Sequence, residues 1–228
     1  MSEERQPLNI DESNGESILQ CTEDGLTLMG NGQTLRGDFA KLTPRLKREN
    51  LSRELLIRAL RGREKNGEYF VVDATAGLGE DSFLLAASGC RVVMYENDPM
   101  IAALLRDAME RAATEAGLAP IIARMTLVEG NSIEELPRLV EKPDVVYLDP
   151  MFPKRSKSGL VKKKFQVIHT IEAPCDAEVA LLDAAVAAGP KKIIVKRPIK
   201  APPLGNRRPT YSIEGKTIRY DCIVLPDD

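Results

Sequence analysis

The stretch Val71–Gly89, VVDATAGLGEDSFLLAASG, places a turn of small residues between two apolar segments. Two β-branched residues lead into Asp73 as a buried strand would, and the apolar run after the turn is typical of a helix. In α/β proteins the carboxyl ends of parallel strands open onto a crevice where ligands bind. We therefore expect a ligand site at the turn formed by residues 74–79.

The rest of the chain alternates strands with helices. Expected strands cover residues 69–74, 91–96, 125–130, 144–149 and 191–197, and expected helices cover residues 81–88, 99–116 and 173–188. Residues 210–225 then form two strands around Glu214-Gly215 with no helix between them. This pattern predicts an α/β fold with a mostly parallel seven-stranded sheet that ends in an antiparallel hairpin, the arrangement of the Rossmann-like methyltransferases.

Residues 1–66 are expected to form a small appendage in front of a main domain at residues 67–228. Asp24-Gly25 and Asn31-Gly32 are turn dipeptides between short alternating runs, which predicts β hairpins. Residues 42–63 read as one helix with a leucine stripe. Its opposite face is basic and contains Arg45, Lys47, Arg48, Arg53, Arg58 and Arg61.

Composition narrows the function classes. The 228 residues have a net charge of −2, so a globally basic nucleic-acid binder is excluded while local basic patches are not. The four cysteines are far apart and form no CxxC pair, which favours free thiols in a reducing cytoplasm and no metal site. No apolar stretch approaches the roughly 18 residues that span a bilayer. His169 is the only histidine, so a hydrolytic triad has little support.

The residues around the glycine turn favour a cationic ligand. Gly77 and Gly79 allow a ligand to approach the backbone closely, but Glu80 and Asp81 at the start of the next helix would repel a phosphate. S-adenosylmethionine (SAM) has a sulfonium and an ammonium and no phosphate. Glu96, at the end of the second strand, can accept hydrogen bonds from both ribose hydroxyls. An ordinary strand-to-helix connection is the alternative, and NAD binders share the ribose carboxylate.

Three further residues are assigned to this cofactor site. Asp73 ends the first strand at the turn, and Asn131 and Ser132 follow the third strand, where they can contact adenine. Asn and Ser are also favoured helix N-caps, which is the alternative interpretation of the last two.

Asp149-Pro150-Met151-Phe152 ends the fourth strand and resembles the D/N-P-P-Y/F motif of methyltransferases that modify exocyclic amines of bases. Asp149 and the carbonyl of Pro150 can hold the N–H groups of such an amine, and Phe152 can stack on the base, which is worth about 1–3 kcal/mol. The alternative interpretation is structural: a strand that ends in a loop made rigid by proline. The following basic residues are candidates for RNA phosphate contacts, namely Lys154, Arg155, Lys157, Lys162, Lys163, Lys164, Lys196 and Arg197.

Taken together, VVDATAGLGEDSFLLAASGCRV, NDPMIAALL, VVYLDPMFP, SGLVKKK and IVKRPIKAPPL resemble the family of small-subunit ribosomal RNA guanine-N2 methyltransferases called RsmJ. The resemblance implies a cytoplasmic, SAM-dependent enzyme that acts on 16S rRNA or the small ribosomal subunit. It also implies SAM contacts by Glu80, Asp81, Glu96, Asn97, Asn131, Ser132 and Asp149.

We therefore expect a methyltransferase that acts on the exocyclic N2 of one guanosine in 16S rRNA. Rival hypotheses are methylation of DNA adenine or a protein glutamine, an NAD-dependent oxidoreductase, and a non-catalytic RNA-binding module. The sequence leaves the oligomeric state open.

Overall fold

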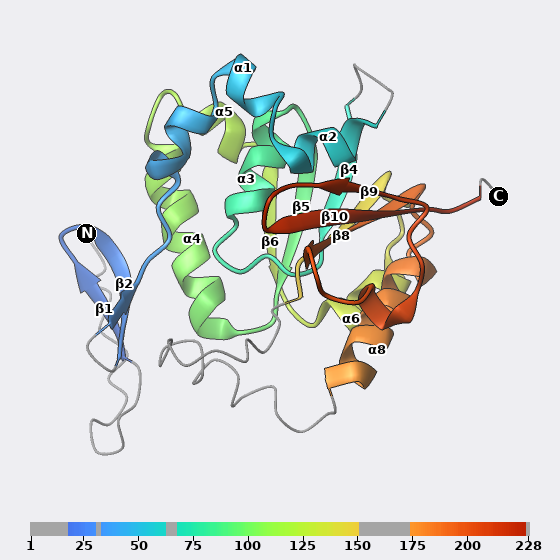
Figure 1. Ribbon diagram of the computed structural model, residues 1–228. Coiled ribbons are helices and arrows are strands. Elements are labelled where there is room, and N and C mark those ends of the chain that lie inside the picture. Colours follow the sequence, from blue (N-terminus) through green and yellow to red (C-terminus); the bar gives the residue numbers. More distant parts are fainter. Residues whose placement is uncertain (1–17, 31–32, 63–67, 151–173, 227–228) are drawn as a thin grey trace.

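The computed structural model describes residues 18–30, 33–62, 68–150 and 174–226. A seven-stranded sheet forms its centre, with helices on both faces (Figure 1). Its strands are β4 (Phe70–Asp73), β5 (Arg91–Glu96), β6 (Met125–Glu129), β7 (Val145–Leu148), β8 (Lys192–Pro198), β9 (Tyr211–Glu214) and β10 (Ile218–Val224). They lie in the order β6-β5-β4-β7-β8-β10-β9.

The strand directions agree with the predicted fold. The five strands from β6 to β8 across the sheet are parallel to their neighbours. β10 is antiparallel to both β8 and β9. The prediction of a mostly parallel seven-stranded sheet that ends in an antiparallel hairpin is therefore confirmed.

Side chains alternate between the two faces along each central strand, as the pleat of a strand requires. Val71 and Tyr147 belong to a hydrophobic cluster on one face, and Val72 and Val146 belong to a second cluster on the other. All four side chains are buried. Burial on both faces explains why these strands read as continuous apolar runs in the sequence.

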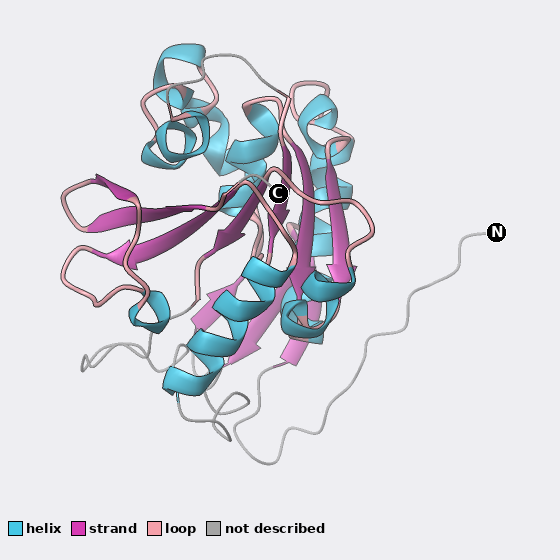
Figure 2. Ribbon diagram, turned by 90° about the vertical axis from the view of Figure 1, so that its right-hand side faces the viewer, coloured by secondary structure: helices cyan, strands magenta, loops and turns pink. Residues whose placement is uncertain are grey.

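Helices cover both faces of the sheet (Figure 2). One face packs against α2 (Leu55–Arg61), α3 (Glu80–Ala87), α4 (Pro99–Ala113) and α5 (Ala119–Ile122). The other face packs against α6 (Ser132–Glu135), η3 (Leu136–Arg138), α8 (Pro174–Ala187) and η4 (Leu204–Asn206). In the described part of the chain, no helix is long and apolar enough to cross a membrane.

A separate three-stranded antiparallel sheet precedes this core, formed by β1 (Ile18–Thr22), β2 (Gly25–Gly30) and β3 (Gln33–Leu35). It confirms the predicted hairpin at Asp24-Gly25, while the Asn31-Gly32 turn lies outside the described residues. The small sheet lies beside α4 (Figure 1).

The prediction of one helix over residues 42–63 is wrong. The segment forms three short pieces, η2 (Phe39–Arg45), α1 (Arg48–Leu51) and α2. Lys47 and Glu54 precede α1 and α2 with ψ of 131°, which is extended backbone that interrupts the helical hydrogen bonds. The Arg45 guanidinium donates two hydrogen bonds to the Glu54 carboxylate, at 2.7 and 2.8 Å, and so holds the bent segment together.

The bent segment shares its core with the main sheet. The Phe39 ring stacks on Phe83 of α3 with 4.7 Å between the ring centroids, and Leu56 and Leu60 of α2 are buried in the same cluster. The division of the chain at residue 66 stays a prediction.

Gly79 precedes α3 with φ of +74°, and a Cβ there would lie 2.7 Å from Cδ1 of Leu105. We expect Gly79→Ala to lower the free energy of unfolding by about 1–3 kcal/mol, because it combines backbone strain with overpacking. Urea unfolding followed by circular dichroism measures the change. Gly117→Ala is the matched control, since nothing lies within 4 Å of its added Cβ. Equal stabilities of the two variants would contradict this account.

Candidate active site

The turn after β4 is held by hydrogen bonds to the two neighbouring strands. The Ala74 N–H donates to the carbonyl of Tyr147 on β7 at 3.0 Å, and the Ala76 N–H donates to the carbonyl of Tyr95 on β5 at 3.1 Å. Gly77 follows with φ of +55°, and no heavy atom lies within 4 Å of the position that a Cβ would take. The turn therefore presents open space beside backbone at the carboxyl edge of the sheet.

Asp73 is the buried anchor of this turn, with 1% of its surface exposed. One carboxylate oxygen accepts from the Thr75 N–H at 3.0 Å, and the other accepts from the Ser82 hydroxyl at 2.6 Å. Burial raises the pKa of Asp73 to about 7, although the hydrogen bonds from Ser82 and Thr75 oppose this shift. The predicted contact of Asp73 with a cofactor stays a prediction, and its geometry gives it a role in shaping the turn.

Glu96 faces the same turn from the end of β5. Its carboxylate accepts from the Gly77 N–H at 2.8 Å and from the Asp98 N–H at 2.9 Å. Partial burial raises its pKa, and the backbone donors act in the opposite direction. These contacts hold the carboxylate next to the open space at Gly77, where the sequence predicted a ribose ligand.

Asp149 follows β7 and lies within reach of two other elements. Its N–H donates to the Thr75 hydroxyl at 2.6 Å, which ties the residue to the turn. One carboxylate oxygen lies 3.0 Å from the ammonium of Lys196 on β8. The side chain of Asp149 is 35% exposed, so it is accessible from the carboxyl edge of the sheet.

Lys196 also binds Asp81, the second residue of α3. Its ammonium lies 2.7 Å from an Asp81 oxygen that accepts, in addition, the Tyr147 hydroxyl at 2.6 Å. Burial disfavours the charged form of Lys196, but the two carboxylates outweigh it and raise the pKa of Lys196. Burial raises the pKa of Asp149, and Lys196 limits that rise. Asp81 therefore has two partners within the protein, and its predicted contact with SAM stays a prediction.

The remaining predicted cofactor residues have simpler surroundings. Asn131 caps α6, since its side-chain oxygen accepts from the Ile133 N–H at 3.1 Å. The predicted helix cap is confirmed, and the predicted contact of Asn131 with adenine stays a prediction. Ser132, the first residue of α6, is buried. Glu80 and Asn97 are exposed. Glu80 lies in the first turn of α3, where a negative charge interacts favourably with the helix dipole and stabilises the helix.

Two residues predicted to contact RNA are placed differently. The side chain of Arg197 is 1% exposed; it donates to the carbonyl of Pro202 at 2.9 Å and pairs with Glu178 at 3.1 Å. The prediction that Arg197 contacts RNA phosphates is therefore wrong, because strand alternation directs its side chain into the protein. Lys196 points into the carboxylate cluster instead of toward solvent. Phe152, Lys154, Arg155, Lys157 and Lys162–Lys164 lie outside the described residues.

The site also contains residues that the sequence analysis missed. Thr75 and Tyr147 were read only as turn and strand residues, yet they hold Asp149 and Asp81. Tyr147 stands two residues before Asp149, on the same face of β7, and this spacing was the available signal. Among the described residues, no group of three His, Cys, Asp or Glu side chains is arranged to hold a metal ion.

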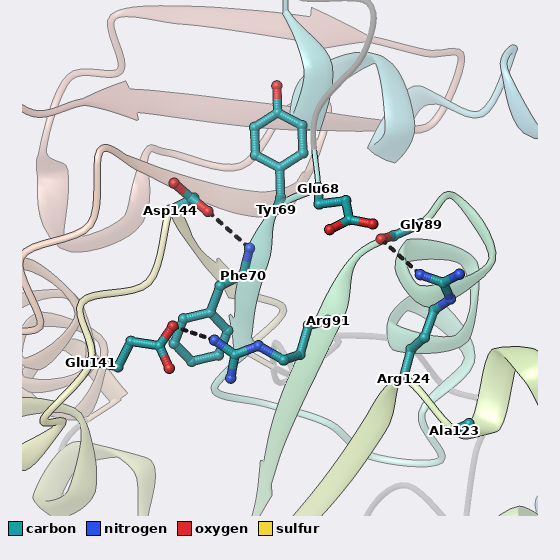
Figure 3. Close-up of a pocket in the computed structure, with 9 residues that line it drawn as sticks. All are labelled: Glu68, Tyr69, Phe70, Gly89, Arg91, Ala123, Arg124, Glu141 and Asp144. Atoms are coloured by element: carbon teal, nitrogen blue, oxygen red, sulfur yellow. Dashed lines mark hydrogen bonds and ion pairs between the residues drawn. The ribbon is translucent and has the colours of Figure 1, made fainter.

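An open pocket of about 440 Å³ lies at the opposite edge of the sheet (Figure 3). Residues at the starts of β4, β5 and β7 line it, among them Phe70, Arg91 and Asp144. Three of its charged groups interact within the protein: Arg91 lies 3.7 Å from the Phe70 ring centroid and pairs with Glu141, and Asp144 accepts from the Phe70 N–H at 2.9 Å. The groups suited to chemistry lie at the carboxyl edge, so we assign the site there.

A mostly parallel sheet with a terminal antiparallel hairpin, together with a carboxylate-lined turn at its carboxyl edge, defines a Rossmann-like SAM-dependent methyltransferase. Comparison with known proteins agrees. A family model described as "Putative SAM-dependent methyltransferase" matches residues 2–225. A crystal structure of a SAM-dependent methyltransferase from Neisseria gonorrhoeae is similar with a TM-score of 0.74 and 31% identity, covering 94% of this chain and 85% of that one.

Curated relatives identify the family more closely. Ribosomal RNA small subunit methyltransferase J of Thioalkalivibrio sulfidiphilus is 48% identical over 81% of this chain and 72% of its own length. The protein of the same name from Pseudomonas fluorescens is 40% identical over 94% of this chain and 84% of its own length. The chain belongs to the ribosomal RNA small subunit methyltransferase J family, and its cofactor is SAM.

The residues at the turn are chemically compatible with this cofactor. Gly77 leaves room beside the backbone, and the carboxylates of Glu96 and Glu80 are of the kind that binds a ribose diol and a cation. Their contacts with the cofactor stay predictions.

The buried Asp73 makes the stability of the protein depend on pH. Its pKa is about 7 in the folded state against an ordinary value of 3.8, so between these values the folded state holds a proton that the unfolded chain has lost. Its contribution to the free energy of unfolding therefore falls as the pH rises from about 4 to 7, by roughly 1.4 kcal/mol for each pH unit. Asp73→Asn removes this dependence. Urea unfolding of the wild type and of Asp73→Asn at pH 5 and pH 7.5 measures this dependence. Equal changes in the free energy of unfolding between the two pH values would refute the role of Asp73.

Proposed function

We propose that this protein transfers the methyl group of SAM to the exocyclic N2 of a guanosine in 16S rRNA, with the rRNA or the small ribosomal subunit as its substrate. The observation that supports this most strongly is the position of Asp149, which lies at the carboxyl end of β7 and is tied to the turn that Glu96 faces. The resemblance to the guanine-N2 methyltransferases and the names of the relatives support the substrate.

The chemistry of an aryl amine explains the need for Asp149. The lone pair of the exocyclic nitrogen is delocalised into the base, so the nitrogen is a poor nucleophile. A carboxylate is too weak a base to deprotonate it outright. Asp149 can instead accept one N–H while the carbonyl of Pro150 accepts the other, and the lone pair then points toward the methyl donor. Positioning of this kind supplies much of the rate enhancement in reactions with an activated electrophile.

Bound SAM supplies an electrophilic methyl group on a sulfonium. The chain has to hold this cation and place the amine opposite it. Glu96 would bind the ribose hydroxyls and Gly77 would let the ligand lie against the backbone. The methylated amine would then lose its extra proton either to Asp149 or directly to water.

Local positive charge supports an RNA substrate. Among the described residues after β8, Lys200, Arg207 and Arg208 are exposed. The predicted basic segment Lys154–Lys164 begins five residues after Asp149 in the sequence. Charges of this kind bind phosphates in a salt-dependent way. We place the reaction in the cytoplasm, where the predicted free thiols would remain reduced.

Asp149→Ala should lower kcat for methyl transfer to 16S rRNA at least about 100-fold, because it removes the acceptor that orients the amine. Transfer of labelled methyl to purified 16S rRNA measures the loss, and mass spectrometry of the digested rRNA locates the methylated base. Asp183→Ala, an exposed aspartate of α8, is the matched control and should keep full activity. Turnover retained by Asp149→Ala would remove the assigned role. In a second assay that offers RNA, DNA and protein together, label in DNA or protein alone would refute the substrate.

Glu96→Gln should weaken SAM binding about 10- to 100-fold, since hydrogen bonds to a charged acceptor are worth about 1.5–3 kcal/mol. Isothermal titration calorimetry with SAM measures the affinity without any RNA. Glu141→Gln is the control, because this exposed carboxylate lies at the opposite edge of the sheet. Unchanged affinity of Glu96→Gln would place the ribose elsewhere.

A further inference from the structure

Four side chains form one connected chain at the carboxyl edge of the sheet. The Tyr147 hydroxyl donates to Asp81, the Lys196 ammonium binds the same Asp81 oxygen, and Lys196 also binds Asp149. Tyr147 belongs to β7, Asp81 to α3 and Lys196 to β8, and Asp149 directly follows β7. The contacts of 2.6, 2.7 and 3.0 Å therefore link the proposed catalytic carboxylate to a more buried anchor.

The charges of this cluster explain its arrangement. Asp81 and Asp149 would repel each other in a partly desolvated place, and the ammonium between them compensates the repulsion. Other ionisable groups face the cluster: Asp73 from β4, Tyr220 from β10, and Arg45 from η2. Asp81 is 19% exposed and Asp149 is 35% exposed, so the anchor lies deeper than the residue that it positions.

Lys196 is poorly placed to bind RNA phosphates at the protein surface. Only a quarter of its side chain is exposed, and its ammonium is already bound by two carboxylates. An RNA phosphate would have to displace one of them. Exposed cations such as Lys200 and Arg207 are available for phosphate instead.

We propose that Lys196 is the positioning residue for Asp149: its ammonium, anchored by Asp81, holds one oxygen of the Asp149 carboxylate and keeps this group ionised as the acceptor of the substrate amine. The catalytic role of Lys196 in this proposal rests on the proposed function. The effect of Lys196 on the ionisation of Asp149 does not, because it can be measured on the protein alone.

The first test uses the protein without cofactor or RNA. With ¹³C-labelled aspartate, the carboxyl resonance of Asp149 is assigned by its loss in Asp149→Asn and is titrated with pH. Lys196→Met should raise the midpoint of this titration by about 1–3 pH units, because an opposite charge at this distance lowers a carboxyl pKa by that amount. Lys196→Arg should keep the midpoint near that of the wild type.

Lys191→Met is the matched control. Lys191 pairs with Asp144 at 2.8 Å at the opposite edge of the same sheet, so its loss should leave the Asp149 titration unchanged. If Lys196→Met fails to fold, Lys196→Gln replaces it as a neutral side chain that can still donate a hydrogen bond. An Asp149 midpoint unchanged in the folded neutral variant would overturn the proposal.

The second test measures methyl transfer to 16S rRNA against pH. Lys196→Met should lower kcat at least about 10-fold at pH 7 and shift the acid limb of the pH–rate profile to higher pH. Lys196→Arg keeps a positive charge and should retain part of the wild-type rate. A variant that changes only KM for RNA and its salt dependence would make Lys196 a phosphate contact and overturn the proposal. If the wild type does not methylate 16S rRNA, the proposed function fails, and the titration still decides the role of Lys196.

Discussion

The carboxyl group of Asp73 is the constraint on which the rest of the site depends. It ends β4 inside the protein and binds the Thr75 N–H on one side and the Ser82 hydroxyl of α3 on the other. Strand, turn and helix therefore meet at one buried group, which is why the turn can leave Gly77 open without losing its shape. Thr75 extends the constraint to the next strand, because its hydroxyl accepts from the N–H of Asp149. The proposed catalytic carboxylate is thus positioned by the same group that shapes the cofactor turn.

Charge balance at the carboxyl edge follows from the register of the sheet. Leu148 of β7 lies opposite Val195 of β8, so the next residues along each strand, Asp149 and Lys196, lie side by side. The helix that starts after the glycine turn brings Asp81 to the same ammonium. A cation enclosed by two carboxylates leaves one net negative charge, which suits a positively charged cofactor and the positive charge that develops on a methylated amine.

Much of the fold could be predicted from local pattern. The strands and the long helices were read from apolar periodicity, and only their ends shifted by a few residues. The prediction of one helix over residues 42–63 was wrong because three short helical pieces that bend around the core bury the same leucines. The extended backbone at Lys47 and Glu54, which separates these pieces, has no clear signal in the sequence. In the site, Glu96 and Asp149 were found because each ends a strand, and this position alone brings it to the carboxyl edge.

The sequence by itself determined the α/β class, the glycine turn and the two strand-end carboxylates. Strand period and turn chemistry are local signals, and each of the two carboxylates ends an apolar strand run. Only the tertiary structure decided which charges meet. Lys196 and Arg197 are neighbours in the chain and looked equivalent as RNA contacts, yet one binds Asp81 and Asp149 while the other is buried against Glu178. The physical reason is that adjacent residues of a strand point to opposite faces, and each face is lined by elements that are distant in sequence.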